Sequence, residues 1–437
     1  MTAVVAETVV PASQTAVRMI PVPRPMPVPG HVPLAPPTAV PAGGPVVRRS
    51  RGALRQDPVH EAAEDLCAAV FRSLRRRDQR DKARLYVRGL LAAEGRKSIR
   101  NIALQTGGPA SEQSLHHFIS DSTWDWQPIR AELTQYLGAS APLTAWVAQP
   151  MAIPKGGEQS VGAGRHFDPH RGQMFRGQQA FGVWFGCPEL VTPVGWRLRL
   201  PEEGPGARAE RPVAFPGGPG YETYDAYEDC AVTGVLETVR QAGLAPRPVV
   251  LDVRGIGTRS TMNRFAEARV PVLARIDPAT RLVVTDPAVP GYGVGTLAAR
   301  NVLHNVRGLR TPVDWSDPQR PGERRTTYVA AVRVMIPDPS AARRRHLMLV
   351  GEWTEPGRPP AELWITDLIR PAPAVLLRLS KQARRVSVAS ATSAQEIGMR
   401  DFSGRSLPGW HRHVTMASVA HAARAMAESQ LLGPGRA

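Results

Sequence analysis

One residue whose position could support chemistry is Asp252. It follows the apolar run Val249–Leu251, which has the composition of a short buried strand, and stands where that strand ends. A carboxylate at a strand end can bind a hard divalent cation, because Mg²⁺ prefers oxygen ligands. A strand-end Asp can equally cap the helix that follows. The local pattern leaves both roles open.

Other groupings of reactive residue types give weaker evidence for a functional site. His411 and His413 are one residue apart, so on a helix they point to different faces and do not form a metal pair. The glycine-rich stretch 216–220 lacks the Lys-Ser or Lys-Thr of a phosphate-binding loop, and no serine stands in a G-x-S-x-G elbow. The cysteines are far apart and odd in number, which argues against a metal pair and a disulfide scaffold: Cys67, Cys187 and Cys230.

The chain is strongly basic. Its 437 residues include 55 Lys and Arg against 38 Asp and Glu, a formal net charge of +17. Lys and Arg gain free energy by releasing counterions condensed on phosphates, so this excess favours nucleic acid as the partner. The first residues lack the pattern of a signal peptide, and no apolar run of about 18 residues occurs. We therefore expect a cytoplasmic, nucleoid-associated protein without a membrane partner.

Composition divides the first third of the chain into two segments. Residues 1–57 are rich in Pro, Ala and Val, with proline at every second position of 21–29, and predict a disordered tail. Residues 59–138 predict a small all-α unit, in which Leu66, Val70 and Leu74 share a helix face. The many arginines of this unit form either a DNA-binding surface or a charged solvent face.

The pattern changes to strands and short helices after residue 143. Apolar or alternating runs predict strands at 143–148, 179–187, 196–200, 247–253, 270–276 and 281–286. Helical patterns lie between them at 224–243 and 259–268. This order suits an α/β fold, a mixed sheet with helices on its faces. A second β-rich segment and two closing helices follow, with strands at 326–336, 346–353 and 361–367 and helices at 372–390 and 411–430.

Three ordered stretches resemble the insertion sequence 701-like family of DDE transposases. They correspond to that family's YxRGLLxxxxRKS opening, its SVGVxRQY…NxQ segment and its DHFEGRSxxGWHHHVT close. In this chain they are the opening motif Tyr86–Ser98 (YVRGLLAAEGRKS), the middle motif Ser160–Phe167 (SVGAGRHF) with Gln178–Ala180, and the closing motif Asp401–Thr415 (DFSGRSLPGWHRHVT).

The resemblance implies an RNase H-like domain at 139–430, with a β-rich insertion that falls at about 311–368. It also implies DNA as the partner, with no small-molecule substrate, and DNA strand cleavage and transfer as the activity. Two Mg²⁺ ions would then be held by an Asp, a second Asp and a Glu. Members of the family often act as oligomers on paired DNA ends, which leaves a homo-oligomer possible.

The three carboxylate positions of the family fall on Gln149, Asp252 and Ser387. In the family's VxVxDETxxxKKG pattern, Gln149 replaces the Asp and Pro150 the adjacent Glu. Asp252 retains the second carboxylate, although the tyrosine of the family's DxxYG is absent. The Glu falls near Ser387, and residues 371–395 contain no Asp or Glu, so its exact register does not matter. One retained Asp predicts very weak Mg²⁺ binding and negligible phosphoryl transfer.

The hypothesis that the sequence favours is a transposase relative that binds DNA but does not cut it, a pseudoenzyme without bound metal. One alternative is an active DDE transposase that uses Mg²⁺ through unusual ligands such as Glu158, Asp252 and Glu396. Another is a domesticated DNA-binding regulator or interaction module. For DNA contact the sequence predicts these basic residues: Arg75, Arg76, Arg77, Arg96, Lys97, Lys155, Arg165, Arg405 and Arg412.

Overall fold

The first part of the described chain is helical. The computed structural model describes residues 58–157, 159–168, 172–200, 222–317, 322–340 and 343–430, and the expected tail 1–57 lies outside them. The helices are α1 (Pro58–Val70), η1 (Phe71–Ser73), α2 (Arg77–Ala92), α3 (Ile99–Thr106), α4 (Pro109–Ser120) and α5 (Gln127–Ser140). Helix α1 has its buried residues at the i, i+3, i+4, i+7 spacing of one helix face, Ala63, Leu66, Cys67 and Val70.

A mixed sheet follows the helices. Its first six strands are β1 (Ala145–Pro154), β2 (Gly164–Asp168), β3 (Gln173–Gly186), β4 (Val191–Arg199), β5 (Val249–Asp252) and β6 (Val272–Arg275). The central order is β4-β3-β1-β5-β6. Strand β3 runs antiparallel to β1 and β4, whereas β1, β5 and β6 are parallel. This is the RNase H-like arrangement that the resemblance implied, so the expected fold class is confirmed.

The β-rich insertion extends this sheet. It contains β7 (Arg281–Val284), β8 (Thr296–Ala298), α8 (Ala299–Asn305), η2 (Arg307–Leu309), β9 (Thr311–Ser316), β10 (Arg324–Met335), β11 (Leu347–Trp353) and β12 (Glu362–Thr366). Strand β12 pairs antiparallel with β6, so the inserted strands complete one 12-stranded sheet. Strand β7, expected in the central part, pairs instead with β10 and β8. The inserted strands therefore begin at β7.

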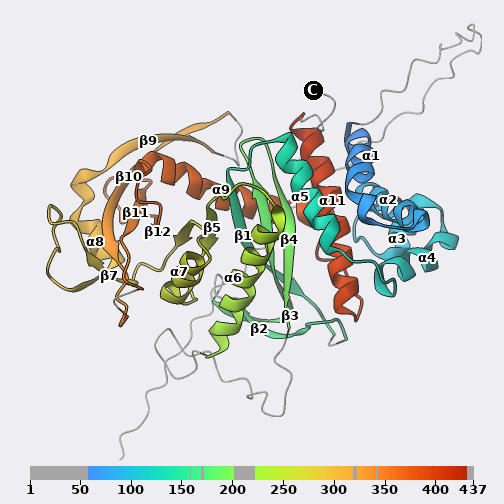
Figure 1. Ribbon diagram of the computed structural model, residues 1–437, viewed down its shortest axis with the longest axis horizontal. Helices are drawn as coiled ribbons and strands as arrows, with labels where there is room; N and C mark the ends of the chain where they lie inside the picture. The colour runs from blue at the N-terminus through green and yellow to red at the C-terminus, as the bar shows by residue number, and fades with distance from the viewer. Residues whose placement is uncertain are drawn as a thin grey trace, which may run out of the picture. The chain divides into compact units, whose positions relative to one another are not determined.

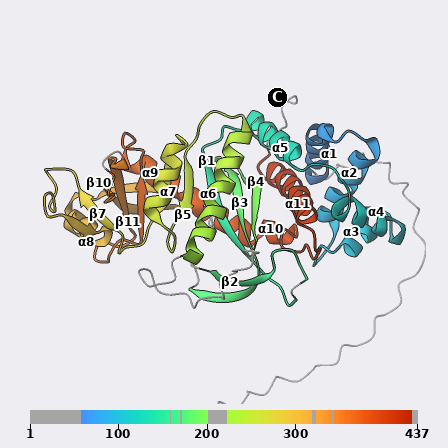
Figure 2. The same ribbon diagram turned by 60° about the horizontal axis from the view of Figure 1, so that its bottom comes forward.

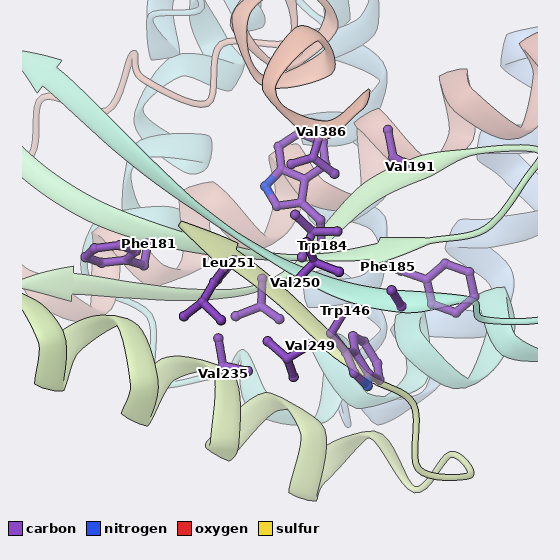
Figure 3. Close-up of a cluster of buried hydrophobic side chains, with 14 of the residues drawn as sticks. Trp146, Phe181, Trp184, Phe185, Val191, Val235, Val249, Val250, Leu251 and Val386 are labelled. Atoms are coloured by element: carbon purple, nitrogen blue, oxygen red, sulfur yellow. The ribbon is translucent and has the colours of Figure 1, made fainter. Parts of the chain in front are cut away.

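Two helices cover opposite faces of the central strands. The remaining helices are α6 (Glu222–Ala242), α7 (Thr258–Glu267), α9 (Pro373–Ala391), α10 (Ser393–Glu396) and α11 (Leu407–Glu428). Figure 3 shows Val235 of α6 on one side of β5 and Val386 of α9, near Trp184, on the other. Parallel strands covered on both faces are continuously apolar, as the buried Val249, Val250 and Leu251 of β5 are.

Helix α11 joins the helical part to the sheet. It lies between β4 and helices α1 and α2 in both views (Figures 1 and 2). Its residues from Arg412 to Ala423 are all buried, because it has neighbours on every side. The described residues from Pro58 to Gln430 accordingly belong to one compact unit. No described helix has the length and apolar composition needed to cross a membrane.

Candidate active site

The carboxyl end of β5 forms an edge beside the middle of β1, where the pairing of these two parallel strands stops. The strands are parallel, with Ala148 opposite Leu251, so the next residues, Gln149 and Asp252, are neighbours. Helix α9 crosses this edge and brings Ser387 to it. All three residues line one cavity of about 300 Å³. The positions that the resemblance assigned to the three carboxylates are thus adjacent, although they come from three distant segments.

Asp252 is held by an arginine two residues along the chain. Arg254 Nε donates to both carboxylate oxygens at 3.0 Å, and its Nη2 donates to Oδ2 at 2.6 Å. The backbone N–H of Arg254 also donates to Oδ1, at 3.0 Å. The hydrogen bonds that Arg254 donates to this carboxylate raise the pKa of its guanidinium. Because each hydrogen bond between charged groups contributes about 1.5–3 kcal/mol, a metal ion would have to displace a strongly bound guanidinium.

A second arginine continues the ion pairs across the strands. Arg275 of β6 stands opposite Asp252 in the parallel pairing, and its Nη1 lies 3.9 Å from Asp252 Oδ2. Its Nη2 lies 3.3 Å from Oε1 of Glu362, which β12 contributes to the cavity. Glu362 also accepts a hydrogen bond from Trp364 Nε1 at 3.2 Å. Both carboxylates that line the cavity are therefore bound by arginine.

The face of α9 that lines the cavity has no acidic residue. It consists of Ser380, Ala383, Arg384 and Ser387, at the i, i+3, i+4, i+7 spacing of one helix face. Arg384 Nη2 also lies 3.7 Å from Asp317, which is 1% exposed. If the family's Glu is matched to another residue of this face of α9, the position still has no carboxylate, because each residue of the face is neutral or cationic.

A comparison with protein families decides the lineage. Residues 69–339, more than half of the chain, match the family described as DDE superfamily endonuclease. The chain belongs to this family. No curated protein matches it. The matched segment includes β1 and β5, and thereby Gln149 and Asp252, and ends before α9.

DDE endonucleases typically use divalent metals, and the cavity of this one does not fit them. Mg²⁺ requires several oxygen ligands with negative charge. Here three arginines line the cavity with two carboxylates, and the expected ligands on β1 and α9 are the neutral Gln149 and Ser387. Across the described residues, no three Asp, Glu, His or Cys side chains are grouped as a metal site would need.

Three basic residues expected to contact DNA are turned inward in this DDE endonuclease. Arg412 is 6% exposed and donates to the carbonyl oxygens of Ile119, Ser120 and Trp124. Lys155 Nζ donates to the carbonyls of Arg400 and Phe402 at 3.1 and 2.7 Å, and burial lowers its pKa, with a smaller effect from Arg96.

Lys97 is 6% exposed and its ammonium donates to the Ala93 carbonyl. The side-chain nitrogens of Arg412, Lys155 and Lys97 donate to backbone carbonyls, so these positions do not support the prediction that the three residues contact DNA. The remaining expected contacts are all exposed: Arg75, Arg76, Arg77, Arg96, Arg165 and Arg405.

The three motifs meet in space around the closing motif. The backbone N–H of Lys97, in the opening motif, donates to Asp401 at 2.7 Å, and the Tyr86 hydroxyl lies 2.9 Å from His413 Nδ1. In the middle motif, the N–H of Val161 donates to the Gly404 carbonyl at 3.4 Å. Many of the residues that carry the resemblance therefore hold the fold together.

Sequence reasoning missed four charged residues of the cavity. Arg254 and Arg275 follow or end parallel strands beside Asp252, and that position was the signal that could have identified them. Arg384 lies three residues before Ser387 on α9, one helical turn away. Glu362 gave no such signal, because it enters the cavity only through the pairing of β12 with β6.

Proposed function

We propose that this DDE endonuclease relative is a DNA-binding protein of insertion-sequence descent, close to the 701-like transposases, that does not cleave or transfer DNA strands. The observation that carries the proposal is the arginine fork on Asp252, beside the neutral Gln149 and Ser387. Phosphoryl transfer by two metal ions needs a cluster of anionic ligands. The cavity offers one inherited carboxylate, and Arg254 binds it.

The rival assignment of an active enzyme with unusual ligands has little support. Glu396 lines a different cavity, together with Lys97 and Asp401, and forms an ion pair with Arg424 at 2.7 Å. Asp252 lines the cavity described above and not this one. Glu158, the third ligand of that assignment, lies outside the described residues.

The DNA-binding half of the proposal rests on charge and exposure. The chain has a net charge of +17, and Arg75, Arg76 and Arg77 form an exposed basic run at the start of α2. Two of them form ion pairs with exposed carboxylates of α2: Arg76 lies 2.9 Å from Asp78, and Arg77 lies 3.9 Å from Asp81. Exposed pairs of this kind contribute only about 0–1 kcal/mol, so phosphate can replace the carboxylates.

Binding of a DNA duplex, measured by fluorescence anisotropy over a range of salt concentrations, tests this half. The account predicts a steep fall of affinity with salt. The double variant Arg75→Gln/Arg77→Gln should reduce this slope by about 0.9 for each phosphate that it no longer neutralises. Arg358→Gln is the matched control, since Arg358 is 74% exposed and pairs with Glu355 in the insertion. Salt-independent or absent DNA affinity contradicts the proposal.

The other half of the proposal is that the protein does not cleave or transfer DNA strands, and a metal-binding measurement tests it. Titration of the wild-type chain with Mn²⁺, followed by electron paramagnetic resonance, should show the same free-ion signal as titration of Asp252→Ala. If wild type binds Mn²⁺ and Asp252→Ala does not, the metal ion displaces Arg254 from Asp252. An intact transposase would then be the better description of the protein.

A further inference from the structure

A loop at the edge of the inserted strands exposes two apolar side chains. It is the segment Gly291–Gly295, between β7 and β8, in which Tyr292 is 54% exposed and Val294 is 69% exposed. Strand β8 is the last strand of the sheet, so nothing in the sheet order continues past it. Two apolar side chains exposed on one loop form a small patch that a partner would bury favourably, because water solvates apolar groups poorly.

The shape of this loop is held by its backbone. Glycines at 291, 293 and 295 have φ values of 103°, 75° and 87°, a region that other residues rarely adopt. The N–H of Tyr292 donates to the Val289 carbonyl at 3.2 Å, and Tyr292 forms a parallel bridge with Val284. These backbone contacts anchor Tyr292 beside Val284 of β7.

The surroundings of the loop are cationic. Arg281 Nη2 donates to the carbonyl and hydroxyl oxygens of Thr296 at 2.6 and 2.8 Å, which places this guanidinium next to the loop. Arg300 and Arg307 are exposed in and just after α8, whose Asn305 lies at the base of the loop near Gly291. Arg307 Nη1 donates to the His304 carbonyl at 3.1 Å, and in the described part of the chain no carboxylate forms an ion pair with any of these three arginines.

Asp286 is the acidic residue between Arg281 and Arg307, and its carboxylate already has a hydrogen-bond donor. Asp286 accepts a hydrogen bond from the backbone N–H of Ala288 at 3.0 Å, so it shapes the start of the loop. An apolar pair flanked by arginines without carboxylate partners fits a polyanion with apolar interior surfaces. Duplex DNA has that chemistry, with phosphates outside and stacked bases within.

We propose that the loop Gly291–Gly295 is a DNA wedge, in which Tyr292 and Val294 enter the minor groove and unstack a base step while Arg281, Arg300 and Arg307 contact phosphates. This inference rests on the proposed DNA-binding function and adds a deformation of the duplex to it. An apolar side chain inserted between base pairs kinks the duplex and brings more phosphates against the protein. A second copy of the chain or another protein is the competing occupant.

The test uses the full chain and a duplex that contains a fluorescent adenine analogue, whose emission rises when its base unstacks. Wild type should increase the emission on binding. Tyr292→Ser/Val294→Ser should abolish that increase and weaken affinity about tenfold, in line with the loss of one or two stacking interactions. The dependence on salt should stay the same because no charge changes. Arg300→Gln/Arg307→Gln should instead reduce the salt slope.

Val375→Ser is the matched control, since Val375 is 51% exposed on α9 and its change should leave affinity and emission as in wild type. If the loop variant binds and unstacks DNA like wild type, the wedge is overturned while DNA binding stands. It is also overturned if wild type self-associates in sedimentation, the loop variant does not, and both unstack DNA equally. If wild type has no DNA affinity, both the proposed function and the wedge are contradicted.

Discussion

Arg254 binds both carboxylate oxygens of Asp252, with a shortest contact of 2.6 Å between Nη2 and Oδ2. In the RNase H-like arrangement this carboxylate ends β5, next to Gln149 in the middle of β1, where the resemblance places the metal ions. In our proposal this guanidinium supplies the positive charge that metal ions would supply in an active DDE enzyme. Arg275 and Glu362 extend the ion pairs to β6 and β12 and join the insertion to the central strands.

Restoring the carboxylates should restore metal binding. The triple variant Gln149→Asp/Arg254→Ala/Ser387→Glu would place carboxylates at all three family positions, beside Glu362, and remove the fork from Asp252. We expect it to bind Mn²⁺, measured as loss of the free-ion resonance signal, whereas Arg254→Ala alone should not, because one Asp beside two neutral groups is a weak site. Equal binding by the single and triple variants would contradict the assignment of Gln149 and Ser387.

The ion pair between Glu352 and Lys381 should contribute strongly to stability. Lys381 Nζ of α9 lies 2.6 and 2.5 Å from the two carboxylate oxygens of Glu352 on β11, and the side chains are 9% and 3% exposed. Glu352→Gln leaves a buried ammonium without its counter-charge, which should lower the free energy of unfolding by about 3–5 kcal/mol in urea denaturation.

Glu355→Gln is the control for this pair. It breaks the 2.9 Å contact with Arg358, whose partners are 58% and 74% exposed, and should cost no more than about 1 kcal/mol. A similar small cost for Glu352→Gln would mean that α9 relaxes enough to hydrate Lys381.

Stability should fall as the pH is lowered below about 6.5. Burial lowers the pKa of His413 to about 4, of His421 to about 3 and of His411 to about 2. Histidine in the unfolded chain titrates near 6.5, so between these values the unfolded state binds more protons than the folded state. The free energy of unfolding should therefore decrease with falling pH, by up to about 1.4 kcal/mol per pH unit for each histidine.

Urea denaturation at a series of pH values measures this slope. His421→Gln should reduce it by the share of one histidine, because His421 lies buried between Thr192 and Ser393. His116→Gln, a change at an exposed histidine of α4, should not alter it. A slope that is the same in His421→Gln and wild type would contradict a neutral, buried His421.

Two arginines of the closing motif should behave differently when replaced. Arg412→Gln removes donors from the carbonyls of Ile119, Ser120 and Trp124, and should lower the free energy of unfolding by about 1–3 kcal/mol or more. Arg405→Gln changes an exposed side chain and should leave stability nearly unchanged while it weakens DNA binding. Thermal melting and anisotropy distinguish the two effects. A stable Arg412→Gln variant with weakened DNA binding would contradict the structural role of Arg412 and support DNA contact.

Local patterns predicted most of the fold, and non-local pairing explains what they missed. The run Val249–Leu251 is apolar because β5 is covered on both faces, so its strand and the position of Asp252 were readable from sequence. The position of Glu362 could not be predicted from sequence, because this residue reaches Asp252 and Arg275 only through the pairing of β12 with β6. The burial of Arg412 could not be predicted, because a charged residue on a helix usually faces water and nothing local shows that α11 is enclosed.

Strand cleavage tests the central claim most directly. Supercoiled plasmid incubated with the wild-type chain and Mg²⁺ or Mn²⁺ should be nicked or linearised no faster than with Asp252→Ala, because Arg254 occupies the one inherited carboxylate. Metal-dependent cleavage by wild type that is abolished in Asp252→Ala would contradict the account.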